Sequence, residues 1–105
     1  MEKQIENYLK VKIKRMGGIC LKLTGYKGIP DRMILVNGKC YFVELKDEGK
    51  KLRPEQQAWQ DKLREMGFVA VMIDSKEKVD VFVEGVSKNG RKRNVTASFV
   101  SKTCD

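Results

Sequence analysis

The sequence predicts a single α/β domain, with a mixed central β-sheet flanked by α-helices on both sides. Helical and strand patterns alternate along the chain, and an Asn37-Gly38 pair between two apolar runs marks a β-hairpin. A nearly continuous apolar run from Phe68 to Ile73 is typical of a strand covered on both faces. A chain of 105 residues can form one such core but not two.

The first element is expected to be a helix over residues 2–16, ended by Gly17-Gly18. Its apolar positions follow helical spacing: Ile5, Leu9, Ile13 and Met16. At about 100° per residue Glu2 falls inside this apolar arc and Glu6 at its edge. Two interpretations of Glu2 stay open, an acid that faces a site and a favourable charge in the first turn of a frayed helix.

Alternating apolar residues predict a first strand over residues 19–23. The following segment, residues 24–30, contains two glycines and one proline and is expected to be a loop. Pro30 fixes its own φ and favours extended geometry at Ile29, so Asp31 should enter the sheet from a restrained backbone.

The hairpin is expected to pair residues 31–36 with residues 39–45. Antiparallel pairing across the turn brings Asp31 close to Glu44. By the period-two rule, Glu44 and Lys46 share one face while Val43 and Leu45 share the other. An unpaired carboxylate in an apolar strand costs several kcal/mol, so a cationic partner is expected there.

A second helix is predicted over residues 54–66, with Pro54 in its first turn and Gly67 after its end. Its inner face carries Trp59 and Leu63. Gln56 falls within that arc, whereas Gln57 projects outside it. An inward glutamine needs a hydrogen-bond partner, either a site residue or the backbone of the core.

The C-terminal part of the chain is less clearly patterned. Residues 76–84 fit either a helix or an edge strand. Residues 1–86 are expected to form the folded domain, and residues 87–105 are expected to be a flexible basic tail. That tail is either an arm that contacts phosphates or a terminus without a role.

Composition limits the class of function. Lysine and arginine number 22 against 14 acidic residues, a net charge of +8, which favours an anionic partner such as nucleic acid. The three cysteines form no CxxC pair, and histidine is absent, so a zinc site and His-based catalysis are not expected. No signal-peptide or membrane-spanning pattern is present, so the protein is expected to be cytoplasmic and to have no membrane partner.

The chemistry-bearing residues resemble the PD-(D/E)xK nuclease superfamily. Pro30-Asp31 matches the first half of its motif and Glu44-Leu45-Lys46 the second. The alternative without catalytic function is a surface cluster of ion pairs among Asp31, Glu44 and Lys46. Each such pair would contribute only about 0 to 1 kcal/mol to the free energy of unfolding, so stability would hardly require it. The resemblance implies a restriction-endonuclease-like core.

More closely, residues 2–74 resemble the VRR-NUC family, the virus-type replication-repair nucleases. The resemblance depends on Glu2, the segment Gly28-Ile29-Pro30-Asp31-Arg32, the segment Val43-Glu44-Leu45-Lys46, and Leu52-Arg53-Pro54-Glu55-Gln56 ahead of Trp59, Leu63 and Gly67. It implies that the helical acid of the family is Glu2 and that its glutamine is Gln56. The tail beyond about Gly85 lies outside the pattern.

This resemblance implies metal-assisted hydrolysis of a phosphodiester bond. Asp31, Glu44 and the backbone carbonyl of Leu45 would bind Mg²⁺, for which Mn²⁺ should substitute, and Glu2 is a candidate further ligand. Lys46 would assist deprotonation of water or stabilise the phosphorane, and Gln56 would orient the water or Lys46. The expected catalytic residues are Glu2, Asp31, Glu44, Lys46 and Gln56.

The family also implies a homodimer that cuts four-way junctions or other branched DNA in a bacterial or phage-infected cell, with no nucleotide cofactor. The side chains expected to contact DNA are Lys27, Arg32, Lys50, Lys51, Arg53, Arg91, Lys92 and Arg93. Flap-specific and end-specific nucleases remain alternatives, as does a non-catalytic basic DNA-binding protein. A regulatory protein that binds a protein partner is a further alternative, in which the charge would be incidental.

Overall fold

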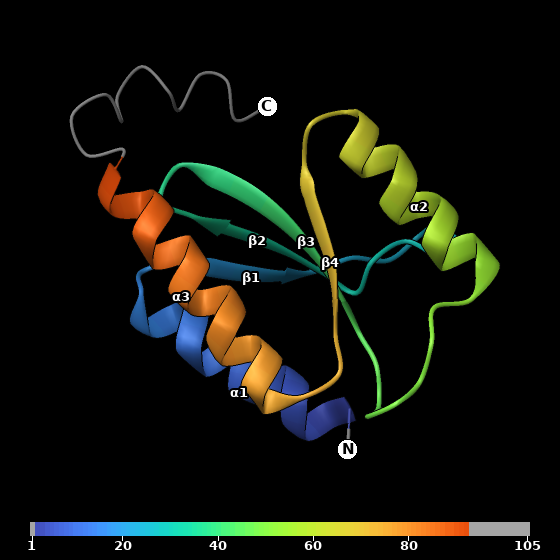
Figure 1. The fold of residues 1–105 in the computed structure, drawn as a ribbon, viewed down its shortest axis with the longest axis horizontal. Helices are drawn as coiled ribbons and strands as arrows, with labels where there is room; N and C mark the ends of the chain where they lie inside the picture. Colours follow the sequence, from blue (N-terminus) through green and yellow to red (C-terminus); the bar gives the residue numbers. More distant parts are fainter. Residues whose placement is uncertain (1, 93–105) are drawn as a thin grey trace.

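The computed structural model describes residues 2–92, which form three helices and a four-stranded sheet in the order β1-β2-β3-β4 (Figure 1). The elements are α1 (Glu2–Arg15), β1 (Ile19–Lys22), β2 (Arg32–Val36), β3 (Lys39–Leu45), α2 (Pro54–Glu65), β4 (Val69–Ile73) and α3 (Lys76–Lys92). Strands β1, β2 and β3 are antiparallel, and β4 runs parallel to β3. The expected mixed sheet is confirmed.

The hairpin of β2 and β3 turns at Asn37-Gly38, as predicted. Both residues have positive φ, 56° and 75°, which a type I′ turn requires. The register pairs Val36 with Lys39 and Arg32 with Val43. This register fixes which side chains share a face of the sheet, and it brings Asp31 next to the end of β3.

The larger core lies between one face of the sheet and helices α1 and α3. Its strand residues alternate with residues of the other face, as the period-two pattern requires. The buried members of this core are Ile5, Leu9, Ile13, Ile34, Val36, Tyr41, Val43, Leu45, Ile73, Val79 and Val86. Burying each large aliphatic side chain contributes about 1.5 to 3 kcal/mol.

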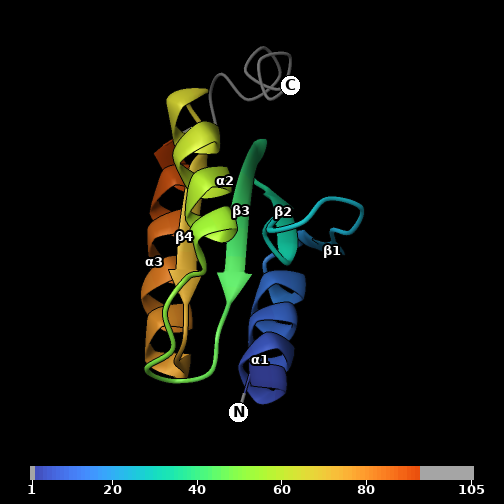
Figure 2. The ribbon, with the colours of Figure 1, turned by 90° about the vertical axis from the view of Figure 1, so that its right-hand side faces the viewer.

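Helix α2 packs on the side of β4 away from α3, so that β4 lies between the two helices in Figure 1, and α2 lies in front of β4 in Figure 2. The fully buried side chain of Gln60 donates a 2.9 Å hydrogen bond to the carbonyl of Val71. Arg64 donates to the carbonyl of Ala70 at 2.7 and 2.9 Å, so it covers part of this sheet edge. These contacts fix the position of α2 relative to β4.

The choice left open at residues 76–84 is settled in favour of helix. Helix α3 begins after Ser75, whose hydroxyl accepts the backbone N–H of Lys78 at 3.2 Å. On its inner face, Val79 and Val86 are buried. Because α3 continues to Lys92, the first six residues of the expected tail are helical, and residues 93–105 lie outside the described part of the chain. No helix within residues 2–92 is long and apolar enough to cross a membrane.

Candidate active site

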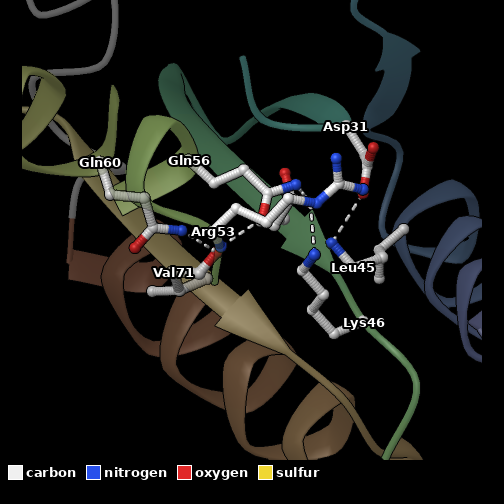
Figure 3. A network of polar contacts seen from close by, with 8 residues as sticks. Asp31, Leu45, Lys46, Arg53, Gln56, Gln60 and Val71 are labelled. Atoms are coloured by element: carbon white, nitrogen blue, oxygen red, sulfur yellow. Dashed lines mark hydrogen bonds and ion pairs between the residues drawn. The ribbon is translucent and has the colours of Figure 1, made fainter. Parts of the chain in front are cut away.

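The two hairpin carboxylates meet at the end of the β2–β3 ladder. Asp31 directly precedes β2, one position beyond the Arg32–Val43 pair, and therefore faces the end of β3. The backbone N–H of Leu45 donates a 2.9 Å hydrogen bond to Oδ2 of Asp31 (Figure 3). This bond replaces the next rung of the ladder and fixes the orientation of the Asp31 carboxylate.

Glu44 is the more deeply buried of these acids. Its residue is 3 % exposed. Oε2 accepts a 2.9 Å hydrogen bond from the side chain of Gln56 and lies 4.0 Å from Nζ of Lys46. Oε1 is buried and has no hydrogen-bond partner in the described part of the chain. One buried carboxylate oxygen is thus left available for a ligand.

The electrostatics of Glu44 agree with this geometry. Burial raises the pKa of its carboxyl group to about 7, with further contributions from Asp31 and Glu2, while Lys46 opposes the shift. Burial and neighbouring carboxylates disfavour the ionised form, whereas a bound cation would favour it. The carboxylates of Glu2, Asp31 and Glu44 therefore concentrate negative charge at this end of the sheet.

Gln56 is inward-facing, as helical phase predicted, and it contacts Glu44. Its side-chain oxygen accepts the backbone N–H of Arg53 at 2.8 Å, so the amide caps the first turn of α2 while its nitrogen holds Oε2 of Glu44. Gln57 is exposed and donates to Asp61 on the outer surface. Gln56 thus holds a carboxylate of the site, and the role that the family resemblance implies for it, orienting water or Lys46, stays a prediction.

Glu2 approaches the same site from the start of α1. Burial raises the pKa of its carboxyl group, and the nearby charges of Asp31 and Asp47 raise it further, while Lys46 opposes the shift. The backbone N–H of Glu2 donates to Oδ1 of Asp47. Asp47, in the loop that follows β3, therefore anchors the N-terminus of α1 beside the site.

Arg32 does not have the surface position expected of a DNA contact. The residue is 8 % exposed, and its guanidinium contacts Oε2 of Glu6 at 2.7 and 2.8 Å. Nη1 also lies 3.4 Å from the carbonyl of Cys20. Arg32 is therefore a buried ion-pair partner that links β2 to α1 and is not placed to contact phosphate.

The other predicted DNA contacts differ in how the structure places them. Lys27, Lys50, Lys51 and Arg53 are exposed on the loops that precede Asp31 and follow Lys46. Arg91 and Lys92 belong to the last turn of α3, and Arg93 lies outside the described residues. Four of the predicted contacts are therefore exposed in the described part of the chain, on the two loops that adjoin Asp31 and Lys46 in sequence.

The loop that leads to Asp31 is docked on α2, which the sequence did not reveal. The indole N–H of Trp59 donates a 3.1 Å hydrogen bond to the carbonyl of Lys27, and the ring of Trp59 contacts that of Tyr26. Gly28 has φ +84°, and a Cβ there would lie 2.7 Å from the carbonyl oxygen of Glu55. A glycine shortly before the Pro-Asp pair was the only sequence signal of this close approach.

The donor set fits a hard divalent cation. Asp31 and Glu44 offer carboxylate oxygens, which Mg²⁺ prefers. The amide of Leu45 points to the β2 side, and on a strand the carbonyl of the same residue points the same way, toward Asp31. No three His, Cys, Asp or Glu side chains within residues 2–92 form a metal-holding group, so the carbonyl, water and substrate would complete the coordination.

A mixed sheet between helices, with an aspartate at one strand's start and a Glu-Leu-Lys segment ending its partner, defines a restriction-endonuclease-like nuclease fold. Known proteins place the chain more narrowly. A solved structure described as a VRR_NUC domain is 32 % identical, has a TM-score of 0.73, and is matched over 79 % of this chain and 94 % of its own. The chain belongs to the VRR-NUC family of nucleases.

A sequence relative agrees with this assignment. The protein named "Putative nuclease p44", from Acyrthosiphon pisum secondary endosymbiont phage 1, is 37 % identical over 79 residues. The match covers 72 % of this chain and 85 % of the relative. A search of protein-family profiles gave no match.

Proposed function

We propose that this protein is a Mg²⁺-dependent DNA endonuclease that hydrolyses phosphodiester bonds in branched DNA and resolves four-way junctions as a homodimer. The observation that carries the proposal is the buried Glu44 carboxylate beside Asp31 and Lys46: Gln56 holds one oxygen, and the other accepts no hydrogen bond from the described residues. Burial of neighbouring carboxylates is energetically costly, and binding of a cation and a phosphate would offset that cost.

The residues divide the chemistry among themselves. Asp31, Glu44 and the Leu45 carbonyl would hold Mg²⁺, which when bound supplies Lewis-acid activation of the phosphate and a lowered pKa for attacking water. The side chain of Lys46 is 11 % exposed, so its ammonium charge is little screened by solvent. Nζ of Lys46 would donate hydrogen bonds to the phosphate oxygens as negative charge develops there.

Glu2 supplies a further carboxylate at the same end of the sheet. Burial raises its pKa, and the neighbouring carboxylates of Asp31 and Asp47 raise it further. We propose that Glu2 completes the outer ligands or accepts the proton of the attacking water. The Gln56 amide keeps Glu44 in one rotamer, as outer partners of metal ligands do.

The homodimer follows from the substrate. Symmetric cleavage of a four-way junction needs two active sites, and one domain holds one, which a C2 dimer would supply. An apolar groove along β4 and α3 is lined by Val71, Met72, Ile73, Lys78, Val81 and Phe82, and we propose that it meets its copy in the partner. Val81 is 70 % exposed at this groove.

The central test is a cleavage panel of four-way junction, flap, duplex and single-stranded DNA in Mg²⁺, Mn²⁺ or EDTA. Cleavage of the junction in Mg²⁺ and Mn²⁺ and none in EDTA is expected. Asp31→Asn and Lys46→Ala should abolish cutting and leave binding, whereas Asp61→Asn and Lys62→Ala, on the exposed face of α2, should cut like wild type. Undiminished cleavage in EDTA would refute the metal mechanism, and preferential cutting of flaps or ends would replace the resolvase assignment.

The dimer has its own test by light scattering. The wild-type protein should have the mass of a dimer at micromolar concentration, and Val81→Glu should have the mass of a monomer. Val11→Glu is the matched control, because Val11 is 49 % exposed on α1, outside the groove. A monomeric wild type would count against the resolvase, and a dimeric Val81→Glu would show that another surface pairs.

A further inference from the structure

Tyr26 is a large, solvent-exposed aromatic residue in the loop that leads to Asp31. The residue is 69 % exposed. The loop is closed at its base by the backbone N–H of Leu23, which donates to the carbonyl of Asp31 at 2.9 Å, and within it Ile29 donates to the carbonyl of Tyr26 at 3.2 Å. Tyr26 therefore belongs to an ordered loop with its base at the candidate site.

The ring of Tyr26 packs against the ring of Trp59. Its centroid lies 5.9 Å from that of Trp59, with the ring planes 55° apart. Trp59 is fixed in turn by its hydrogen bond to the carbonyl of Lys27. The tilted contact covers only a small part of Tyr26. Packing against Trp59 therefore does not explain why an aromatic residue occupies such an exposed position. The remaining ring surface is available to a planar ligand.

The surroundings select the kind of planar ligand. Lys27 follows Tyr26 and is exposed, and Arg53 is exposed directly before α2, the helix on which the Tyr26 loop is docked. Basic side chains bind the phosphates of nucleic acid, while aromatic rings stack on its bases. A base inside a continuous duplex already has both faces covered by its neighbours, so only an unpaired or unstacked base can use such a ring.

The reach of the loop limits where that base lies. Tyr26 precedes Asp31 by five residues, which span at most about 17 Å of extended chain. Successive nucleotides of a stacked strand are about 3.4 Å apart, so this distance corresponds to about five stacked nucleotides, and to fewer where the strand is unstacked and more extended. A base that stacks on Tyr26 would therefore lie within about five nucleotides of the phosphate at Asp31.

We propose that Tyr26, braced by Trp59, is a stacking platform for an unpaired nucleobase close to the scissile phosphate. This inference rests on the proposed nuclease function and deepens it, because it gives the enzyme a way to prefer branched DNA over continuous duplex. Stacking of one base on an aromatic side chain contributes about 1 to 3 kcal/mol. Loss of the ring should weaken binding of DNA that contains unpaired bases by about 5- to 150-fold and should leave binding of continuous duplex unchanged.

The experiment measures binding separately from cutting, in the Asp31→Asn background with Mg²⁺. The probes are a matched duplex and a DNA of the same sequence with a flap, with 2-aminopurine placed in turn at each of the five nucleotides beside the branch. Added protein should quench one flap position. The additional substitution Tyr26→Ala should abolish the quenching and weaken binding of the flap DNA by about 5- to 150-fold, while the affinity for duplex stays unchanged. Tyr26→Phe, which keeps the ring, should bind the flap DNA within about twofold of the parent protein.

The outcomes separate this inference from the proposed function. Equal flap affinities for Tyr26→Ala and its parent, or an equal loss on duplex and flap, would overturn the stacking role even where wild-type protein cuts DNA. A loss shared by Tyr26→Phe would also overturn it, since the hydroxyl would then be the contact. If Tyr26→Ala lowers the melting temperature, Tyr26→Gln, which keeps a long side chain without a ring, provides the same comparison. Absence of cleavage by wild-type protein would instead refute the nuclease.

Discussion

The side-chain amide of Gln56 bridges Glu44 and the backbone of Arg53, with hydrogen bonds of 2.9 and 2.8 Å. One side chain therefore begins helix α2 and also holds a carboxylate of the candidate site. The position of Glu44 depends in this way on a helix that joins the chain after the hairpin. Glu44 therefore has this hydrogen bond only when α2 is packed on the sheet.

Gln56→Ala should reduce both stability and activity. Loss of the cap and of the bond to Glu44 should cost about 1 to 2 kcal/mol in the free energy of unfolding. Loss of an outer partner of a metal ligand should lower cleavage about 10- to 100-fold. Urea denaturation and initial cleavage rates measure the two effects. Gln57→Ala, one residue along the same helix, should change neither, and equal effects of the two variants would contradict the role of Gln56.

The stability of metal-free protein should fall as pH rises from about 4.5 to 7. The pKa of Glu44 is raised from 4.5 to about 7 in the folded state, so the folded state binds more protons than the unfolded chain in this window. The contribution of Glu44 is therefore fully present below pH 4.5 and lost through pH 7, a difference of about 3 kcal/mol. Denaturation in EDTA at several pH values measures the slope.

Glu44→Gln should flatten that slope, because the amide does not titrate. Glu65→Gln, at the exposed end of α2, is the matched control and should retain it. Saturating Mg²⁺ should also reduce the slope, since a bound cation favours the ionised carboxylate. An unchanged slope in Glu44→Gln would show that another group causes the pH dependence.

Arg32→Met should destabilise the protein without changing the salt dependence of DNA binding. The substitution leaves Glu6 half-buried and without its partner, which should cost about 1 to 3 kcal/mol. Lys50→Met should behave in the opposite way, with little loss of stability and a reduction of about 0.9 in the slope of log binding constant against log salt. A reduced salt-dependence slope for Arg32→Met would show instead that Arg32 contacts phosphate.

Much of the site could be predicted from sequence because its determinants are local. The Asn37-Gly38 turn fixes the register of the hairpin, and the register alone brings Asp31 to Glu44. Helical phase alone separates Gln56 from Gln57. Each of these inferences needs only backbone periodicity within a short segment.

The remainder depends on contacts between distant segments. Arg32 looked like a surface cation because its partner Glu6 lies 26 residues earlier and on another element. Residues 76–84 alternate in a way that fits helix and strand equally, and the packing of Val79 against the α1 side of the sheet decides for helix. The docking of the Tyr26 loop on Trp59 spans more than thirty residues and leaves only a glycine as its local sign.

That glycine gives the last prediction. Gly28→Ala and Gly25→Ala both place a side chain at positive φ, 84° and 108°, so both should lose about 1 kcal/mol. Only at Gly28 would the new Cβ meet backbone, 2.7 Å from the carbonyl oxygen of Glu55, whereas nothing lies within 4 Å at Gly25. Overlap with a helix backbone cannot be relieved by a rotamer change, so Gly28→Ala should lose about 1 to 3 kcal/mol more. Because the loop leads directly to Asp31, Gly28→Ala should also cut DNA more slowly at a temperature where both variants are folded. Equal melting temperatures and equal cleavage rates for the two variants would show that the loop is not held against α2.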